Sequence, residues 1–472
     1  MNRLRKILNS RYVMVFFLTL VAIWFFCWVL YISTIPSSLF GGPDEGLRYL
    51  VPKFIFENGR LPTGYDTATI HSMGNWSYAF YPQFLGSLVS AFFILVVSIF
   101  NHTPEGLIYA ARMASVVFGV ITVLFVGKSV EKVFKGNKNA KVFSFLAMAF
   151  VAAWPQLAFL SAYTNNDIVA LSGVSVIVYA CIAGYKDHWN ATNVSILAIG
   201  MVICLLGYVN SYGFVLFGGL FFLVSLWWQA DEKKYPLKLV GLATGIVLIS
   251  TGPLFIRNAV IYQGDVFGIS SFREETLKWE SQTGRDAQKS YTDISGHGLL
   301  RLIGDEGYRQ AQLDSAIARF GKMTVAPEDK YMNVYRSFAI IGVIGFLWML
   351  LDGLARSIRS HRRLKDLKIM IVRHKTIILL IACILASCLT TLALSLYYSL
   401  MIDFQPQGRY IICLLVPLVI VSVSGFYYLI EKIIVRKYQL PTIVLLAICY
   451  LLTTLIVFYK YVYSVAILYG TY

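Results

Sequence analysis

Two adjacent acidic residues, Asp44 and Glu45, follow the first long apolar stretch of the chain. Acidic side chains are costly beside hydrocarbon, so a pair next to a membrane span usually faces a cavity, pairs with a cation or handles a proton. A carboxylate in this position can take the proton of a hydroxyl group as a general base. Because Pro43 suits the first position of a helix and acids suit its first turn, a simple helix start is an equally open interpretation.

The second candidate is Arg409, which lies in the polar stretch 403–410. A guanidinium at the end of a span is expensive unless it meets an anion, and its planar fork can bond two phosphate oxygens. Gly408 would let a lipid head group approach the backbone. We therefore predict that Arg409 binds a lipid phosphate, with Arg257 and Tyr410 as further contacts. There are two alternatives: the Arg409 side chain could extend to the membrane interface, or it could form a structural ion pair with Asp403.

Other polar residues are candidates for binding a sugar or an acceptor. Asn166 and Asp167 precede an apolar segment, where they would either cap a helix or orient an acceptor. His71 lies in the first polar loop, where a solvated side chain is the simpler interpretation. The full set of candidates of this kind is Asn166, Asp167, Arg48, His71 and Gln407.

The composition identifies an integral membrane protein. Hydrophobic residues make up 57% of the 472 residues and charged residues 14%, with a mean hydropathy of +0.66, which excludes a soluble globular protein. The net charge is +16, but the basic residues gather in short loops between apolar segments, so we infer no nucleic-acid partner. All seven cysteines lie within apolar segments, which argues against disulfides and thiolate metal sites.

The apolar segments that must position the candidates predict an all-α polytopic protein. Basic residues before the first segment place the N-terminus in the cytoplasm and the candidate residues outside. That segment shows no signal-peptide cleavage site and is expected to be a retained helix. Residues 84–100 are expected to lie along the outer interface or re-enter, because a crossing would put the basic loop 128–141 outside. About eleven spans are then expected, at 12–33, 107–128, 141–160, 167–185, 193–210, 212–228, 237–255, 336–355, 376–399, 410–430 and 441–464.

We expect three parts along the chain. Residues 1–255 form a transmembrane module that includes a first outer loop, 34–106, with a helix near 47–57. Residues 256–335 form a long, partly helical outer segment, for example at 315–320. Residues 336–472 form the C-terminal helices and end outside. In this topology four polar stretches lie at the outer ends of spans, where they could line one cavity: 44–45, 165–167, 255–258 and 403–410.

A carboxylate near a phosphate-binding arginine, on the membrane face that lacks nucleotide sugars, suits sugar transfer from a polyisoprenyl phosphate carrier. Asp44, with Glu45 beside it, would act as general base, and Arg409 would stabilise the departing phosphate. A single displacement would invert the anomeric centre. The sequence contains no Gly-rich phosphate loop, zinc-binding helix motif or convincing serine triad.

Three short motifs carry a resemblance to a known family. They are Pro43 to Glu45, then Asn166 and Asp167, then Gln407 to Tyr410. Together they resemble the GT-C superfamily of polytopic glycosyltransferases, in particular a bacterial branch with Pro-Asp-Glu and Gln-Gly-Arg-Tyr. In that branch a histidine often stands where this chain has Arg48.

The resemblance implies a bacterial cytoplasmic-membrane enzyme with an extracytoplasmic site. It implies two juxtamembrane helices in the first outer loop, a long outer loop after the seventh span and an acid at the start of the first loop as the base. It also implies an undecaprenyl-phosphate sugar donor and an inverting transfer. No cofactor is implied; divalent metal use varies across the superfamily, and nothing in the sequence demands a metal.

The expected partners are the lipid-linked sugar donor, an envelope glycopolymer or glycolipid acceptor, and membrane lipids. Three alternatives remain open at the level of sequence. A transporter or flippase of lipid-linked sugars should carry charges near the middle of the membrane. A polysaccharide polymerase or ligase that uses lipid diphosphate donors should need more than one essential arginine. A non-catalytic scaffold should tolerate replacement of Asp44.

Overall fold

The computed structural model describes residues 10–33, 41–71, 74–229, 234–360 and 364–465. The regular secondary structure of this part of the chain is helical, with two isolated β-bridges in the loops. Nine of the described helical segments are long and apolar enough to cross a membrane. The protein is therefore a multi-pass integral membrane protein. The helices in these segments are α2 (Arg11–Ser33), α5 (Pro104–Val133), α8 (Asp167–Asp187), α10 (Tyr212–Gln229), α11 (Lys234–Ile261), α16 (Asp329–Ser360), α17 (Leu364–Met401), α18 (Leu415–Ile433) and α19 (Arg436–Phe458).

Three apolar helices are shorter: α4 (Leu85–Ser98), α6 (Ala140–Ala152) and α9 (Ala191–Leu205). The single span expected at 141–160 is wrong, because Pro155 begins a separate short helix, α7 (Pro155–Leu160), after an extended Trp154. A proline is well suited to the first turn of a new helix and cannot continue the hydrogen bonds of the preceding one. The span expected from 410 likewise begins as a 3₁₀ helix, η4 (Gly408–Leu414), before α18.

Helix α4 lies beside the first turns of α5. The hydroxyl of Ser90 donates to the carbonyl of Ala111 at 2.9 Å, and Ile94 packs with Ala110 and Ala111. Fourteen residues give a helix of about 21 Å, shorter than the roughly 30 Å of hydrocarbon in a bilayer. This geometry is consistent with the expectation that 84–100 does not cross the membrane.

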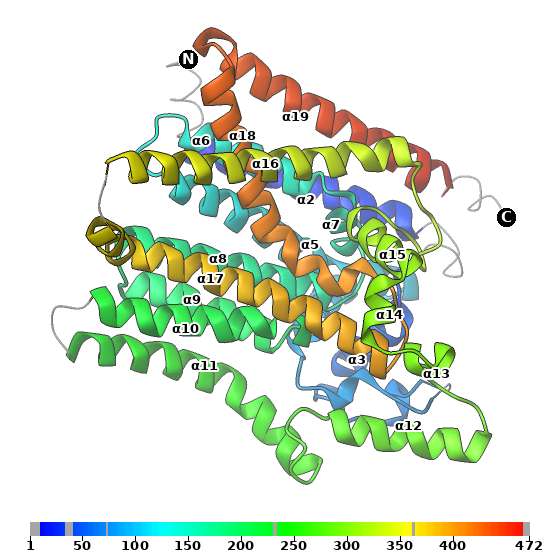
Figure 1. The fold of residues 1–472 in the computed structure, drawn as a ribbon. Helices are drawn as coiled ribbons and strands as arrows, with labels where there is room; N and C mark the ends of the chain where they lie inside the picture. The colour runs from blue at the N-terminus through cyan, green and yellow to red at the C-terminus, as the bar shows by residue number, and fades with distance from the viewer. Residues whose placement is uncertain (1–9, 34–40, 72–73, 230–233, 361–363, 466–472) are drawn as a thin grey trace.

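The connections between the long helices gather at two ends of the molecule (Figure 1). One end, which we call the site end, carries α3 (Glu45–Asn58), α12 (Ile269–Thr283), α13 (Tyr291–Ser295), α14 (Leu299–Gly304) and α15 (Glu306–Ile317). The last turn of α10, the first turn of α11 and the connection between α18 and α19 lie at the opposite end. The basic residues expected before the first span, Arg3, Arg5 and Lys6, lie outside the described residues, as do the start of the first outer loop, 34–40, and the external terminus expected at 466–472.

Helix α8 is the central helix of the fold. In its most apolar window 89% of the residues are buried, against 17% for α11, which lies at the edge of the bundle. Helix α8 begins at the site end with Asp167, so the polar residues that precede it reach the interior of the protein. The core continues beside α2, where Trp28 packs against Phe320 with ring centroids 5.4 Å apart.

Two expected helix boundaries need correction. Helix α3 covers the helix expected at 47–57, but it begins at Glu45, and Pro43 lies before its cap and not in its first turn. The helix expected at 315–320 ends at Ile317 in the structure, and Phe320 then forms a β-bridge with Val325.

Candidate active site

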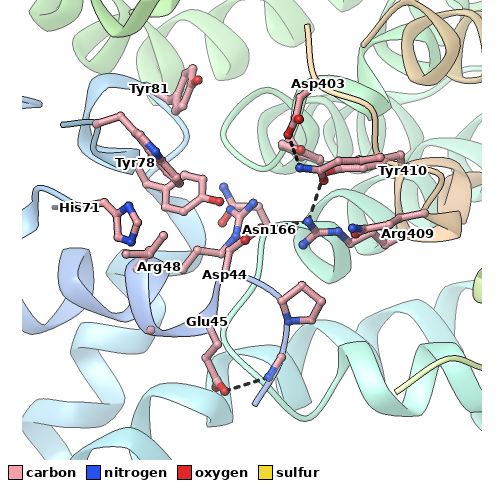
Figure 2. Close-up of a pocket in the computed structure, with 18 of the residues that line it drawn as sticks. Asp44, Glu45, Arg48, His71, Tyr78, Tyr81, Asn166, Asp403, Arg409 and Tyr410 are labelled. Carbon is pink, nitrogen blue, oxygen red and sulfur yellow. Dashed lines mark hydrogen bonds and ion pairs between the residues drawn. The ribbon is translucent and has the colours of Figure 1, made fainter. Parts of the chain in front are cut away.

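A cavity of about 1590 Å³ opens at the site end. Eight of the ten candidate residues line it, among them both acids of the first motif and both residues predicted from the Gln-Gly-Arg-Tyr motif to contact phosphate (Figure 2). They come from α3, the first outer loop, the segment before α8 and the segment around η4. The eight are Asp44, Glu45, Arg48, His71, Asn166, Gln407, Arg409 and Tyr410, whereas Asp167 and Arg257 are not among the lining residues.

The backbone directs the Asp44 side chain into this cavity. Asp44 has a left-handed conformation with φ of 59°, and although it is the N-cap of α3, its side chain makes no capping hydrogen bond. Aspartate tolerates this region better than most residues, at a cost of about 1–3 kcal/mol. Two residues earlier the chain passes so close to Tyr163 that a Cβ on Gly42 would lie 2.0 Å from the ring. The geometry therefore does not support the simple helix-cap interpretation of Asp44.

Asp44 forms an ion pair with Arg409. The Nη2 atom of Arg409 lies 2.9 Å from Oδ2 of Asp44 and also donates to the hydroxyl of Tyr410 at 3.1 Å (Figure 2). The Asp44 side chain is 35% exposed, while that of Arg409 is 3% exposed. The pair thus joins a carboxylate that faces the cavity to a guanidinium that lies behind it.

Arg409 retains donors that the protein does not use. Its Nε and Nη1 atoms are buried and have no hydrogen-bond partner among the described residues. A buried donor without a partner costs about 1–3 kcal/mol, and more when the group is charged. Such a guanidinium is prepared to bond an anion that enters the cavity.

The pKa of Asp44 lies below its usual value. Burial alone would raise it, but the positive charges of Arg409 and Arg48 outweigh burial, and hydrogen bonds from Arg409 and Tyr78 lower it further. Asp44 is therefore ionised at neutral pH and can accept a proton.

A second chain of hydrogen bonds fixes Tyr410. Its hydroxyl donates to the side-chain carbonyl of Gln405, whose amide donates to Asp403. Burial is the main reason why the pKa of Asp403 is raised. The alternative that Arg409 pairs with Asp403 is not seen, because Arg409 pairs with Asp44 instead.

The expected role of Gly408 needs correction. A Cβ at this residue would lie 2.0 Å from the backbone nitrogen of Ala316, and the Gly408 nitrogen donates to the Ser315 hydroxyl at 2.6 Å. The space beside Gly408 is therefore filled by α15 and not left for a head group. The glycine permits close approach of a helix of the outer segment to the residue before Arg409.

Glu45 forms a buried, fully bonded ion pair. Its two oxygens accept from Nε and Nη2 of Arg112, each at 2.7 Å, and also from the backbone nitrogens of Thr164 and Gly42 at 3.1 and 3.4 Å. The Glu45 and Arg112 side chains are 8% and 6% exposed. Glu45 thus ties the start of α3 to α5 and to the segment before α8.

Removing Arg112 is expected to destabilise the protein strongly. Arg112→Met leaves the Glu45 carboxylate buried without its cation, which typically costs about 3–5 kcal/mol. Thermal unfolding of the purified protein would show a much lower midpoint. The exposed pair of Arg60 with Asp66 provides the control, since Arg60→Gln should hardly change the midpoint. Equal midpoints for the two variants would contradict this role of Glu45.

Arg48 lies over two aromatic rings. Its guanidinium carbon is 4.1 Å from the centre of the Tyr78 ring and 5.8 Å from that of Tyr208. The side chain is buried, and its Nε atom has no hydrogen-bond partner among the described residues. A cation held in this way keeps a fixed orientation at the cavity wall.

The polar residues at the start of α8 have different surroundings. Asn165 caps the helix: its side-chain oxygen accepts from Ile168, and its amide donates to Leu160 and Tyr163. Asn166 lines the cavity. Asp167 is buried, and neither of its carboxylate oxygens has a hydrogen-bond partner within the described ranges. The cap predicted for this segment therefore belongs to Asn165.

His71 and Gln407 both line the cavity. The His71 backbone nitrogen donates to the Trp76 carbonyl at 2.8 Å, and the two residues form an isolated β-bridge. The buried side-chain oxygen of Gln407 has no hydrogen-bond partner in the described part of the chain. Both residues are therefore placed where a substrate could contact them.

Arg257 lies elsewhere. It donates from Nη2 to the carbonyls of Leu61 and Pro62, at 3.3 and 2.8 Å. The structure therefore places Arg257 against the first outer loop and away from Arg409.

Sequence reasoning missed several lining residues. Tyr78 belongs to an aromatic run that suggested only an interfacial belt, and Tyr208 follows an apolar segment with nothing to mark it. Arg273 and Lys322 lie in the long outer segment, whose fold over the cavity no local pattern indicates. Among the residues that the structure describes, no three His, Cys, Asp or Glu side chains are grouped so that they could hold a metal ion.

Comparison with known proteins identifies the fold. No protein-family model and no curated protein sequence matches the chain. The apo oligosaccharyltransferase of Archaeoglobus fulgidus superposes with a TM-score of 0.54 at 12% identity, over 98% of this chain and 56% of that chain. Its complex with Zn and sulfate gives 0.51 at 13%, over 96% and 53%. ArnT from Cupriavidus metallidurans bound to undecaprenyl phosphate gives 0.48 at 13%, over 98% and 75%.

The likeness to the oligosaccharyltransferase shows that this chain has the fold of GT-C membrane glycosyltransferases, at low sequence identity. The chain spans little more than half the length of that enzyme, and 64% of the length of ArnT in its apo state. The fold expected from the sequence is confirmed.

Proposed function

We propose that this protein is an inverting glycosyltransferase of the bacterial cytoplasmic membrane. It moves a sugar from undecaprenyl phosphate to a hydroxyl group of an envelope glycopolymer or glycolipid, on the outer face of the membrane. The observation that carries the proposal is the ion pair of Asp44 and Arg409 at the cavity wall. It brings together an ionised carboxylate and a guanidinium with two unused donors.

The cavity suits a donor whose lipid chain stays in the bilayer. Leu394, Tyr397 and Met401 of α17 line it. Tyr397 and Met401 are also 58% and 56% exposed at the surface of this membrane-spanning helix. The cavity wall is therefore continuous with the exposed surface of α17, and a polyisoprenyl chain can lie along that surface while its phosphate reaches Arg409.

The residues account for each step of the displacement. Asp44 accepts the proton of the acceptor hydroxyl as its oxygen bonds to the anomeric carbon. The bond from that carbon to the phosphate oxygen breaks, and the phosphate leaves as an anion that Nε and Nη1 of Arg409 bond. The products are the glycosylated acceptor with inverted configuration, the lipid phosphate and protonated Asp44.

Donor binding also strengthens the base. In the free protein the charge of Arg409 holds the pKa of Asp44 down. A bound phosphate offsets that charge, so the pKa of Asp44 rises and the carboxylate binds a proton more readily. Asp44 therefore becomes a better base when the donor is in place.

In this mechanism Glu45 positions the site and does not transfer a proton. Its oxygens already accept four hydrogen bonds, which leaves no free site for a substrate proton. We assign Tyr410 to holding Arg409, and Asn166, His71 and Gln407 to contacts with the sugar or acceptor, because all of them line the cavity.

One alternative function has an observation in its favour. Besides Arg409 and the Glu45-paired Arg112, Arg48 is a further buried guanidinium at the cavity wall, and a polymerase or ligase that uses a lipid diphosphate donor would need such a cation. The chemistry at Asp44 would be the same, but the leaving group would be a diphosphate.

A transfer assay with the purified protein tests the proposed function. The protein is mixed with a panel of undecaprenyl-phosphate sugars and extracted envelope polymer. We expect sugar to appear on the polymer with inverted configuration and lipid phosphate to be released in equal amount. If no donor supports transfer, but proteoliposomes move the lipid-linked sugar between leaflets, the protein is a transporter and the proposal fails.

A further inference from the structure

Three cations line the cavity without a carboxylate partner in the described part of the chain. They are Arg48 on α3, Arg273 on α12 and Lys322 in the turn between the bridge residues Phe320 and Val325. Arg409, by contrast, pairs with Asp44, and Arg112 pairs with Glu45. The first three cations come from segments far apart in the sequence, so their meeting in one cavity is a property of the fold.

Of the three cations, Arg48 gives the strongest indication of an anion site, because its side chain is buried, with only 6% of the residue exposed. Burying a guanidinium costs several kcal/mol unless it is paired and hydrogen-bonded. The charges of Asp44 and Asp167 act on Arg48 from nearby, but neither carboxylate forms an ion pair with it, and its Nε has no partner among the described residues. Stacking on Tyr78 at 4.1 Å fixes its plane and leaves it ready for an oxyanion.

Arg273 and Lys322 also line the cavity, and both side chains are exposed, whereas that of Arg48 is buried. Positive charges around a cleft raise the local concentration of anions and steer them into the cleft. Together with Arg48 they give the cavity wall three cations without a carboxylate partner among the described residues, although Glu105 and Asp403 also line the cavity.

We infer that the acceptor is an anionic glycan and that Arg48 binds one of its phosphate or carboxylate groups beside the reacting hydroxyl. Arg273 and Lys322 attract the glycan to the cavity. This inference rests on the proposed function and names the class of acceptor. It leaves the lipid phosphate of the donor to Arg409, so the two guanidinium groups serve different substrates.

The test compares an oligomer of glycerol phosphate with a neutral maltooligosaccharide of the same length as acceptors. Wild type should prefer the anionic oligomer in kcat/KM. Arg48→Gln should lose about 10- to 100-fold with this oligomer, the range for a charged hydrogen bond, and little with the neutral one. Arg48→Lys should keep part of the preference. The double variant Arg273→Gln/Lys322→Gln should raise KM for the anionic oligomer at low salt, an effect that about 1 M salt abolishes.

A matched control removes two exposed cations that do not line the cavity, as Arg285→Gln/Arg301→Gln, and should leave both KM values unchanged. Equal kcat/KM of wild type for the two acceptors overturns the inference while the proposed function stands. So does an equal loss with both acceptors in Arg48→Gln. If Arg48→Gln instead loses only a preference for lipid diphosphate over lipid monophosphate donors, the anion belongs to the donor and the inference is wrong.

Failure of the proposed function has a different signature. Binding of the glycerol-phosphate oligomer can be measured without turnover, by displacement of a fluorescent analogue from the detergent-solubilised protein. Binding that Arg48→Gln weakens supports the anion site even if no sugar is transferred. Absence of binding to wild type overturns the inference whether or not sugar transfer occurs.

Discussion

Asp44→Asn is expected to lower kcat for sugar transfer by about 10²- to 10⁴-fold, the contribution typical of a positioned general base. Asparagine has nearly the same shape and tolerates the left-handed backbone of this residue, so the fold should persist. The asparagine side chain cannot accept the proton of the acceptor hydroxyl. Because Arg409 loses its carboxylate partner, the variant should bind the donor phosphate at least as tightly as wild type does.

The measurement is a single-turnover transfer rate beside a donor-binding curve. Asp66→Asn provides the control, since this carboxylate lies in the same outer loop and pairs with Arg60; its rate should match that of wild type. If Asp44→Asn transfers sugar as fast as wild type, the general-base role is wrong. The transporter and scaffold interpretations would then explain the cavity better.

Arg409→Gln is expected to reduce kcat by about 10²- to 10³-fold, as for loss of one preorganised donor to a developing anion. It should also raise KM for the lipid donor, because the phosphate loses its cation in the ground state too. Arg409→Lys should fall between wild type and Arg409→Gln, since lysine keeps the charge but not the planar fork. Arg257→Gln removes the same charge away from the cavity and provides the comparison.

Arg409→Gln should also change the pH dependence of kcat/KM, in a direction that the charges around Asp44 determine. Asp44 acts as a base only when it is ionised, so activity is present above its pKa and is lost as pH falls through it. In wild type, Arg409 and Arg48 hold this pKa below its usual value of 3.8. Without Arg409 the effect of burial weighs more, the pKa rises, and the acid limb of kcat/KM should move to higher pH. An unchanged limb would show that another group titrates.

Much of the fold follows from the pattern of apolar residues. About eleven spans were expected, and nine of the described helical segments are long and apolar enough to cross a membrane. The spans expected at 141–160 and 193–210 contain the short helices α6 and α9, which are about as short as α4 in 84–100. The break at Pro155 was missed because hydropathy is the same on both sides of it. The fold of 256–335 could not be predicted, since the contacts of α12 and α15 are with residues far away in the sequence.

The site was predicted in part because charged residues near hydrocarbon are rare enough to be informative. Asp44 and Arg409 were singled out separately, yet their ion pair joins residues that are 365 apart in the sequence. Glu45 and Asp44 look equivalent in sequence, and they are distinguished only by Arg112, more than two turns into α5, which binds Glu45. Gly408 was interpreted as an open approach, but α15 fills that space.

The close packing of Gly408 against α15 joins the outer segment to the residue before Arg409. On one side of α15, the Ser315 hydroxyl accepts a hydrogen bond from the backbone nitrogen of Gly408, next to Arg409. On the other side Trp154 donates to the Ala316 carbonyl at 2.7 Å. If an acceptor shifts α15 on binding, we expect Arg409 to shift with it. By reciprocity, the factor by which the acceptor changes donor affinity equals the factor by which the donor changes acceptor affinity.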